Sequence, residues 1–370
     1  MKTNLHKYWL WIVVLTASIC WGTSCSDTEL HTGQQLLFPA RDNGLWGYID
    51  QTGKMVIEPE YIAAEPFGNG LAPVCVEENH VRKWGYVDEK GNRVIEPQFE
   101  HAKPFSEGLA AVCQDDLWGF IDFSGNWVIK PQYKEVGSFH WGRAWFYCYK
   151  AGSYNTQFGE TFHTKLFGFL DRKGNVVIEP QFDMVHDFYE GLCEARLGSC
   201  PLGKRGYIDT LGNWSIHAVA NAAGDFRNGI APMNINNTFF YINHEGEILN
   251  ATTPHIRIDE QFAHLRVDVK RSIAEDMEVS MNDKIERTSN DLTLDSVSYR
   301  NLFAQYFKND LKSFRNERGL FGFKDPQRNV VIEPQFFEAE PFCNGLSRVV
   351  FKGWKMGYID MTGKVIYKEK

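Results

Sequence analysis

Histidine, cysteine and carboxylate side chains are the groups of this chain that could bind a metal ion, transfer protons or act as nucleophiles. The histidines His101, His140, His186, His217 and His244 fall at different points of the pattern described below and show no His-x-x-x-His spacing. Ligands that converge on one ion are therefore not indicated. The sequence predicts no metal site and no cofactor.

The cysteines do not have the spacing of a zinc site either. No Cys-x-x-Cys occurs, and Cys193 and Cys200 are seven residues apart. Cys75 and Cys113 stand at the same point of two consecutive copies of a repeat, which favours small buried side chains on neighbouring strands. A disulfide between them is the alternative, because an oxidising compartment permits one.

Acidic residues recur in a fixed frame, and a turn explains them better than paired-carboxylate chemistry does. An Asp is followed three residues later by Gly, between two runs of strand-forming residues. This fits a type I turn whose Gly takes a positive φ, so that each copy opens with a hairpin. The turn position holds Asp50, Asp88, Asp122, Asp171, Asp209, Asn243, Asp325 and Asp360, and Arg328 alone breaks the glycine column. Because the chain also lacks a Gly-x-Ser-x-Gly, phosphate-loop or dinucleotide motif, we expect no catalytic site.

The second half of each copy adds a third strand. A proline lacks an amide donor, so we expect the second strand to end at Pro59, Pro97, Pro131, Pro180 and Pro334. Two aromatic columns follow, and we expect both to be buried: Tyr61, Phe99, Tyr133, Phe182 and Phe336, then Phe67, Phe105, Phe139, Phe188, Phe226 and Phe342. A glycine then leads a short apolar strand such as Leu71-Ala72-Pro73-Val74.

Six copies align without a gap over 24 positions, with starts at Trp46, Trp84, Trp118, Phe167, Arg205 and Phe321. Leu45-Trp46-Gly47-Tyr48-Ile49-Asp50 with Val56-Ile57-Glu58-Pro59, and the later copies, resemble the WG-repeat family of bacterial proteins over residues 36–270 and 320–367. The chain departs from that family at Arg205 and Met356, which replace Trp, and at Ala218 and Ala220, which replace the Pro and the aromatic. We expect an all-β array of three-stranded antiparallel units.

The two ends of the array leave two arrangements open. Leu37-Phe38-Pro39-Ala40 matches the third strand of a copy, and Met356 to Tyr367 holds a hairpin without one. Together the ends could complete one unit, which would give a closed propeller-like ring with no free sheet edge. The alternative is an open curved β-repeat superhelix.

Two insertions interrupt the array. Residues 271–319 carry an apolar stripe at helical spacing, at Tyr299, Leu302, Phe303, Tyr306, Phe307, Leu311 and Phe314. We expect an amphipathic helix that covers the array, with a partner-docking helix as the alternative. The shorter insertion, from Phe146 to Leu166, is rich in aromatic residues and predicts an extended hairpin. If the chain binds a glycan, Trp141, Trp145 or the tyrosines of this hairpin should lie flat and exposed.

The first residues predict export. Lys2 and Lys7 precede an uncharged run from Tyr8 to Ile19, which is too short to span a membrane, so residues 1–24 are expected to be a signal peptide. Gly22-Thr23-Ser24-Cys25 resembles a lipobox, which implies a lipid on Cys25 and a tether over residues 25–35. Ser26-Asp27-Thr28-Glu29 resembles the acidic tags of surface-exposed lipoproteins, so the expected location is the cell envelope, at the outer membrane.

Charge and repetition limit the function. Removal of residues 1–24 takes away Lys2 and Lys7 and no acid, which moves the formal charge from −8 to −10 and disfavours nucleic acid as a partner. We expect a non-catalytic scaffold that binds a protein or a glycan, because repeat arrays present long surfaces. The alternative is a surface hydrolase whose site is built from residues 146–166 and 271–319. The ligand-binding residues are not identified by the sequence.

Overall fold

The structure of this protein is a computed structural model. It describes residues 36–151, 163–198, 203–251, 255–262, 265, 267–270, 278–281, 302, 311–325 and 327–370. The predicted signal peptide, the lipidation site Cys25 and the tether over 25–35 therefore lie outside the described residues. No helix among the described residues is long and apolar enough to cross a membrane.

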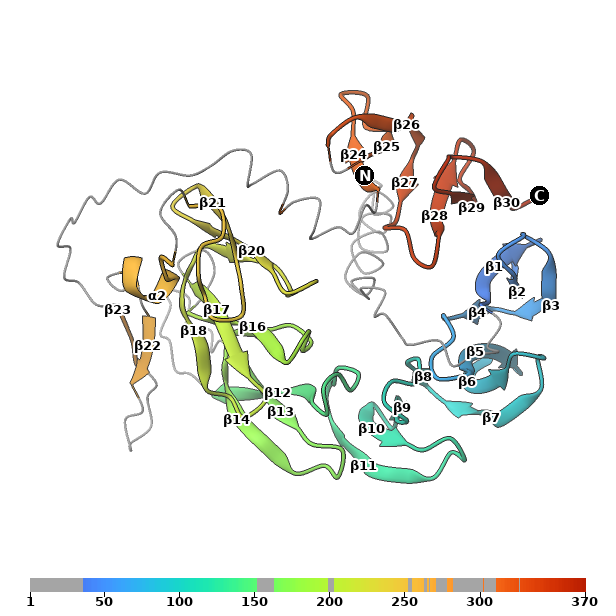
Figure 1. The fold of residues 1–370 in the computed structure, drawn as a ribbon. Helices are drawn as coiled ribbons and strands as arrows, with labels where there is room; N and C mark the ends of the chain where they lie inside the picture. The colour runs from blue at the N-terminus through green and yellow to red at the C-terminus, as the bar shows by residue number, and fades with distance from the viewer. Residues whose placement is uncertain are drawn as a thin grey trace, which may run out of the picture.

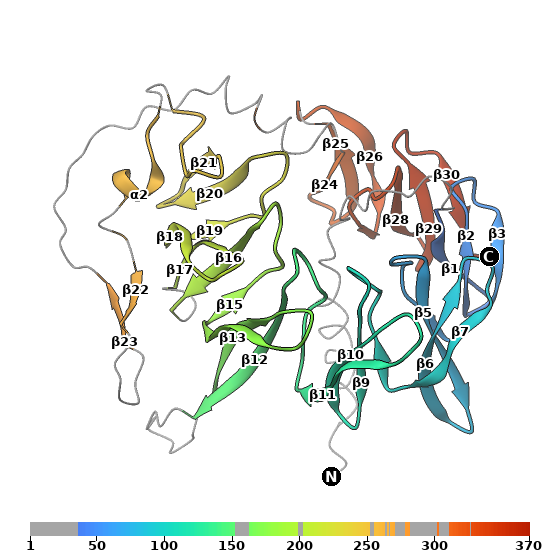
Figure 2. The same cartoon turned by 60° about the horizontal axis from the view of Figure 1, so that its bottom comes forward.

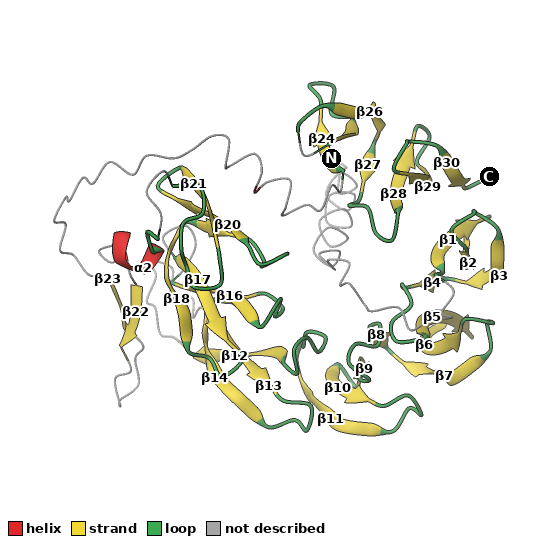
Figure 3. Ribbon diagram, viewed as in Figure 1, coloured by secondary structure: helices red, strands yellow, loops and turns green. Residues whose placement is uncertain are grey.

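The described chain folds into small antiparallel sheets, which Figure 1 shows in chain order around an arc and Figure 3 shows to be strands joined by loops. The first sheet contains β1 (Phe38–Asp42), β2 (Leu45–Ile49) and β3 (Met55–Tyr61). The second contains β4 (Ala63–Ala64), β5 (Leu71–Glu78), β6 (Val81–Asp88) and β7 (Arg93–Phe99). The third contains β8 (His101–Ala102), β9 (Ala110–Gln114), β10 (Leu117–Ile121) and β11 (Trp127–Tyr133).

The middle of the chain continues the same plan. The fourth sheet contains β12 (Ala144–Ala151), β13 (His163–Leu170) and β14 (Val176–Phe182). The fifth contains β15 (Met184–Val185), β16 (Leu192–Leu197), β17 (Lys204–Asp209) and β18 (Trp214–Ala220), and the sixth β19 (Ala222–Ala223), β20 (Ala231–Ile235) and β21 (Thr238–Ile242). The one-turn helix α2 (Ile258–Gln261) and the pair β22 (Val267–Lys270) and β23 (Glu278–Met281) follow.

Two further sheets end the chain. One contains β24 (Lys312–Arg315), β25 (Phe321–Lys324) and β26 (Val330–Phe336). The last contains β27 (Glu338–Ala339), β28 (Leu346–Phe351), β29 (Lys355–Asp360) and β30 (Val365–Lys368). In Figure 1 the two-residue strands β4, β8 and β27 lie nearer the middle of the arc than β7 and β11, which lie at its rim.

The predicted hairpin turns are confirmed. In the turn between β10 and β11, Asp122 Oδ1 accepts the amides of Ser124 and Asn126, both at 2.9 Å. Gly125 takes a φ of +80° and donates its amide to the Asp122 carbonyl. The hydrogen bond from the Asn126 amide lowers the pKa of Asp122. The recurring aspartates therefore close turns, and Arg328 adopts the left-handed conformation, with φ +70°, where the glycine is missing.

The prediction that each second strand ends at its proline is wrong. Strand β7 continues through Pro97 to Phe99, which pairs with Trp84, while the register shifts between the pairs Trp84–Phe99 and Tyr86–Ile95. The extra residues form a bulge that lies against Gly85. A Cβ on Gly85 would lie 2.5 Å from the Ile95 carbonyl oxygen and 2.8 Å from the Pro97 nitrogen. The glycine after each tryptophan is thus needed for the bulge to approach the facing strand.

The expectation that the third strand completes the three-stranded unit of its own copy is also wrong. Strand β5, the third strand of the first copy, pairs along its whole length with β6 of the next copy. Each sheet of the repeats is therefore assembled from two consecutive copies, and a two-residue strand such as β4 gives four of the described sheets a fourth member. Strand β1 likewise pairs with β2, so the two ends of the chain do not share a sheet.

Aromatic contacts join neighbouring sheets. The Tyr48 ring of β2 packs edge-on against Phe67 ahead of β5, with ring centroids 4.8 Å apart, and the Tyr48 hydroxyl donates to the Glu65 carbonyl at 2.8 Å. The same ring contact recurs in the pairs Tyr86–Phe105, Phe120–Phe139, Phe169–Phe188, Tyr207–Phe226 and Phe323–Phe342. Most members of both predicted aromatic columns are buried, as expected.

The first and last sheets also lie side by side, as both views show (Figures 1 and 2). The buried Tyr358 hydroxyl donates to the Pro39 carbonyl at 2.9 Å, and the Tyr367 hydroxyl donates to the Arg41 carbonyl at 2.7 Å. Arg41 forms an ion pair with Glu369, with Nε 2.9 Å from Oε1. The ends of the array are thus held together by packing and side-chain hydrogen bonds, without strand exchange.

The expected insertion is shorter than 271–319, and its predicted helix cannot include Phe314. Lys312–Arg315 form strand β24, which pairs with β25, and Leu311 is buried in the core of that sheet. A sheet partner within reach outweighs a short helical pattern. Leu302 packs against the buried pair Ile230 and Tyr241. The remaining residues of the stripe lie outside the described part of the chain.

Candidate functional site

Titratable side chains directly follow four of the two-residue strands, whereas Gly224 follows the fifth, β19. This position holds Glu65 after β4, Lys103 after β8, His186 after β15 and Glu340 after β27. The backbone amide of each donates to the carbonyl eight residues later on the next strand, as His186 does to Glu194 at 3.1 Å. The strand pairing therefore decides which side chains meet.

His186, Glu194 and Asp225 converge at such a place. His186 Nδ1 lies 3.2 Å from Asp225 Oδ1 and 3.5 Å from Glu194 Oε2. The nitrogen and the two carboxylate oxygens all lie within 4.8 Å of one another. His186 and Glu194 belong to the fifth sheet, whereas Asp225 follows β19 of the sixth, so the cluster joins two sheets.

Glu194 is the buried member of the cluster. It is only 3 % exposed, and its Oε1 pairs with the Arg205 guanidinium on the neighbouring strand β17. Its other oxygen, Oε2, is buried and has no hydrogen-bond partner. Burial raises the pKa of Glu194, while His186 and Arg205 lower it. The hydrogen bond to Asp225 raises the pKa of His186.

A second histidine–carboxylate contact lies beside this cluster. His140 Nε2 is 3.6 Å from an oxygen of Asp187, the residue after His186. Burial raises the pKa of Asp187, and His140 and Lys103 lower it. The Cys193 thiol donates to the carbonyls of His186 and Glu194, so the sulfur is occupied by the backbone. The cluster therefore offers one nitrogen and two oxygens to a ligand.

The sequence spacing gave no indication of these contacts. The expectation that ligands do not converge is wrong for His186, where two carboxylates meet one imidazole. The structure also describes one carboxylate contact each for His217, with Asp259 at 3.1 Å, and His244, with Glu190 at 3.1 Å. The available signal was the recurrence of a charged residue four positions after the aromatic residue of the second strand, which is the position that His186 occupies after Phe182.

The aromatic residues singled out in the sequence divide into exposed and packed. Trp141 is 58 % exposed. Trp145 is partly buried, with the Lys103 ammonium 5.4 Å from its ring centroid. In the predicted hairpin, whose strands β12 and β13 pair as far as Ala151–His163, Tyr147 is buried and Tyr149 is exposed. The other aromatics of that insertion, Tyr154, Phe158 and Phe162, lie outside the described residues.

An exposed aromatic pair was not anticipated. In three sheets, the residue just before the two-residue strand caps a hairpin turn of the same sheet with its polar side chain. Glu100, just before β8, accepts the amide of Asp116 in the turn between β9 and β10 at 3.0 Å. Asp183 and Asn221 make the equivalent bonds, to the amides of Gly198 and Asn236. In the last sheet Phe337 stands at this position and stacks on Trp354, with centroids 5.5 Å apart and planes 12° apart. Trp354 is 69 % exposed.

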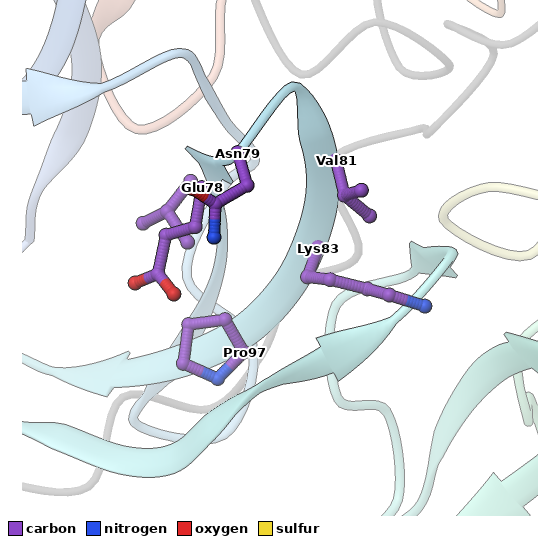
Figure 4. Close-up of a pocket in the computed structure, with 6 residues that line it drawn as sticks. Glu78, Asn79, Val81, Lys83 and Pro97 are labelled. Carbon is purple, nitrogen blue, oxygen red and sulfur yellow. The ribbon is translucent and has the colours of Figure 1, made fainter.

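A hollow of about 290 Å³ lies on the β5–β6 hairpin beside Pro97 (Figure 4). Its lining mixes apolar side chains with Glu78 and Lys83, which extend to different sides of the hairpin in Figure 4. No pair of charges converges on it in this view, so we assign it no role.

The cysteines Cys75 and Cys113 are both buried and unbridged. The packing interpretation is therefore confirmed, and the alternative of a disulfide between them is wrong. Burial raises the pKa of the Cys113 thiol to about 11, which keeps it protonated near neutral pH.

The family described as WG containing repeat matches residues 46–79, 84–118, 118–148, 167–199, 206–239 and 321–353, which is more than half of the chain. No curated protein matches the sequence. Among solved structures, the chain is similar to BamB from Moraxella catarrhalis, at 9 % identity and TM-score 0.43, over 89 % of this chain and 94 % of that one.

The chain is also similar to two other solved structures. The WD40 β-propeller domain of Doa1 is 10 % identical with a TM-score of 0.31, over 90 % of this chain and 98 % of that one. Tricorn protease is 11 % identical with a TM-score of 0.31, over 86 % of this chain, and the chain spans 44 % of that protein's length. The repeat matches identify the protein, which belongs to the family of WG-containing repeat proteins.

Proposed function

We propose that this chain is a non-catalytic binding scaffold of the cell envelope, held at the outer membrane by a lipid on Cys25. The repeated polar residues are used by the fold, since the aspartates close turns and the glycines admit bulges. What remains for a partner is the set of side chains that depart from the repeat. In this proposal the array closes as a propeller-like ring, because the first and last sheets are in contact.

The exposed pair Phe337–Trp354 is the observation that carries the proposal. Stacking on Phe337 covers one face of the Trp354 indole and limits its rotation, while the side chain stays 69 % exposed. An exposed, pre-ordered aromatic ring loses little conformational entropy on binding and offers a flat apolar surface with one N–H donor. Such a surface suits the apolar face of a sugar ring, so we propose a glycan as the partner.

The test is binding of the mature chain to envelope glycans, with Trp354→Ala compared to Trp141→Ala. Trp141 is the matched control, because it is similarly exposed and also takes a positive φ, but among the described residues no aromatic ring stacks on it as Phe337 stacks on Trp354. We expect Trp354→Ala to weaken binding by at least about tenfold, or ~1.4 kcal/mol, and the control to bind like the parent chain.

Equal retention of both variants would refute this site. If the mature chain retains an envelope protein and no glycan, the partner is a protein and the glycan proposal is wrong. Release of sugars from the retained glycan would support the alternative function, a surface hydrolase. A Cys25→Ser variant tests the anchor separately, since it should move the protein from the membrane fraction to the soluble fraction.

A further inference from the structure

We propose that His186, Glu194 and Asp225 form a binding site for a divalent transition-metal ion, with Zn²⁺ as the preferred ion. This site is separate from the aromatic pair and does not depend on it. Its three donors come from three places in the chain that the fifth and sixth sheets bring together.

The separations of the donor atoms fit tetrahedral zinc. With ligands about 2.1 Å from the metal, two ligand atoms of a tetrahedral site are roughly 3.4 Å apart. His186 Nδ1 lies 3.2 Å from Asp225 Oδ1 and 3.5 Å from Glu194 Oε2, so both of these separations match. The third separation, between the two carboxylate oxygens, is no more than 4.8 Å, so these two atoms would approach by at most about 1.4 Å when an ion binds.

The buried oxygen of Glu194 points independently to a ligand. Oε2 has no hydrogen-bond partner although the residue is 97 % buried, and it faces the histidine nitrogen. A buried carboxylate oxygen without a hydrogen bond is costly, and a cation between it and the histidine would remove that cost. The contact with His186 alone offsets only part of this cost while the histidine is neutral.

The surroundings orient the donors. Arg205 holds Oε1 of Glu194, which leaves Oε2 turned to the other two groups, and the hydrogen bond from the His186 amide to the Glu194 carbonyl fixes the backbone between them. Partners of this kind position metal ligands and strengthen binding. His186 and Asp225 are partly exposed, so a water molecule can take the fourth position.

The donor set selects the class of ion. One imidazole nitrogen with two carboxylate oxygens suits Zn²⁺ and its neighbours among the transition metals. Ca²⁺ needs six to eight oxygens and Mg²⁺ six oxygens in an octahedron, which this set does not supply. Because Asp225 lies in a different sheet from the other two donors, the bound ion would also clamp two sheets together.

The test is titration of the chelator-treated mature chain with ZnCl₂ at pH 7.5, followed by calorimetry and thermal unfolding. We expect one zinc ion to bind per protein chain and the Tm to rise with zinc concentration. The zinc affinity should be at least ~10-fold lower in His186→Gln and in Asp225→Asn. His217→Gln is the matched control, because His217 meets one carboxylate only, and it should bind zinc like the parent chain.

Thermal unfolding of each variant without zinc shows whether it is folded, and Asp225→Asn keeps the size of a partly exposed side chain. X-ray absorption should show nitrogen and oxygen ligands at about 2.0–2.2 Å and no sulfur, which separates this site from binding at the exposed Cys148. Zinc affinity unchanged in both variants, or sulfur among the ligands, would overturn the proposal.

Discussion

Replacing Glu65 by glutamine should stabilise the protein above pH 7 and have little effect near pH 4. Glu65 is partly buried after β4, where burial raises its pKa to about 7 from 4.5; Arg348 lowers the pKa and Glu340 raises it. Arg348 is already paired with Glu340, and the Tyr48 hydroxyl is bonded to the Glu65 backbone, so the carboxylate gains little from either residue.

The size of the effect follows from linkage. Because the folded-state pKa is the higher one, the stability associated with neutral Glu65 is complete below pH 4.5 and is lost as the pH rises through 7. The difference of about 2.5 between the pKa of Glu65 in the folded and unfolded states corresponds to a free energy of unfolding of at most about 3 kcal/mol. Glutamine keeps the neutral form at every pH, so the variant should recover that amount above pH 7.

The assay is urea unfolding of the parent chain and Glu65→Gln at several pH values from 4 to 8. Groups that titrate in both proteins cancel in the difference between their free energies of unfolding. Glu96→Gln, at an exposed carboxylate of β7, is the control and should stay within about 0.5 kcal/mol of the parent. A Glu65→Gln protein that is less stable at pH 8, or a difference that does not vary with pH, would refute the reasoning.

Two further substitutions test the bulge and the contact between the ends. Gly85→Ala should destabilise the protein by roughly 2–4 kcal/mol, because the new Cβ meets backbone, whereas Gly142→Ala, where nothing lies within 4 Å, should cost only about 1 kcal/mol for its positive φ; similar urea midpoints for the two would contradict this. Tyr358→Phe should cost about 1–2 kcal/mol, because the Pro39 carbonyl loses its buried donor, and an unchanged melting temperature would show that this bond does not stabilise the ends.

The sequence was sufficient for the turn that opens each repeat, although not for the end of its second strand. An Asp with Gly three residues later has few conformations open to it, so the turn at Asp122 and Gly125 could be predicted, and the hairpin follows from it. Burial of the aromatic columns follows equally from their recurrence. These features depend on residues close together in the chain, where spacing and geometry are linked directly.

Pairing between copies could not be predicted in the same way. A strand such as β5 alternates in the same manner whether it pairs back to its own hairpin or onward to the next, so the pattern does not choose between them. The bulge at Pro97 depends on the missing side chain of Gly85 in the facing strand. His186, Glu194 and Asp225 meet only once this pairing is known.

The offset between copies and sheets has a consequence for how such chains change length in evolution. Unequal recombination that inserts or removes one whole copy keeps every strand partnered, because the strand that one copy donates is accepted by whichever copy comes next. A gene shortened after Asn79, where the first family match ends, would instead leave β5 without β6 and expose a ladder of unpaired amides. A viable shorter protein should therefore stop after a hairpin, as it would at Phe99.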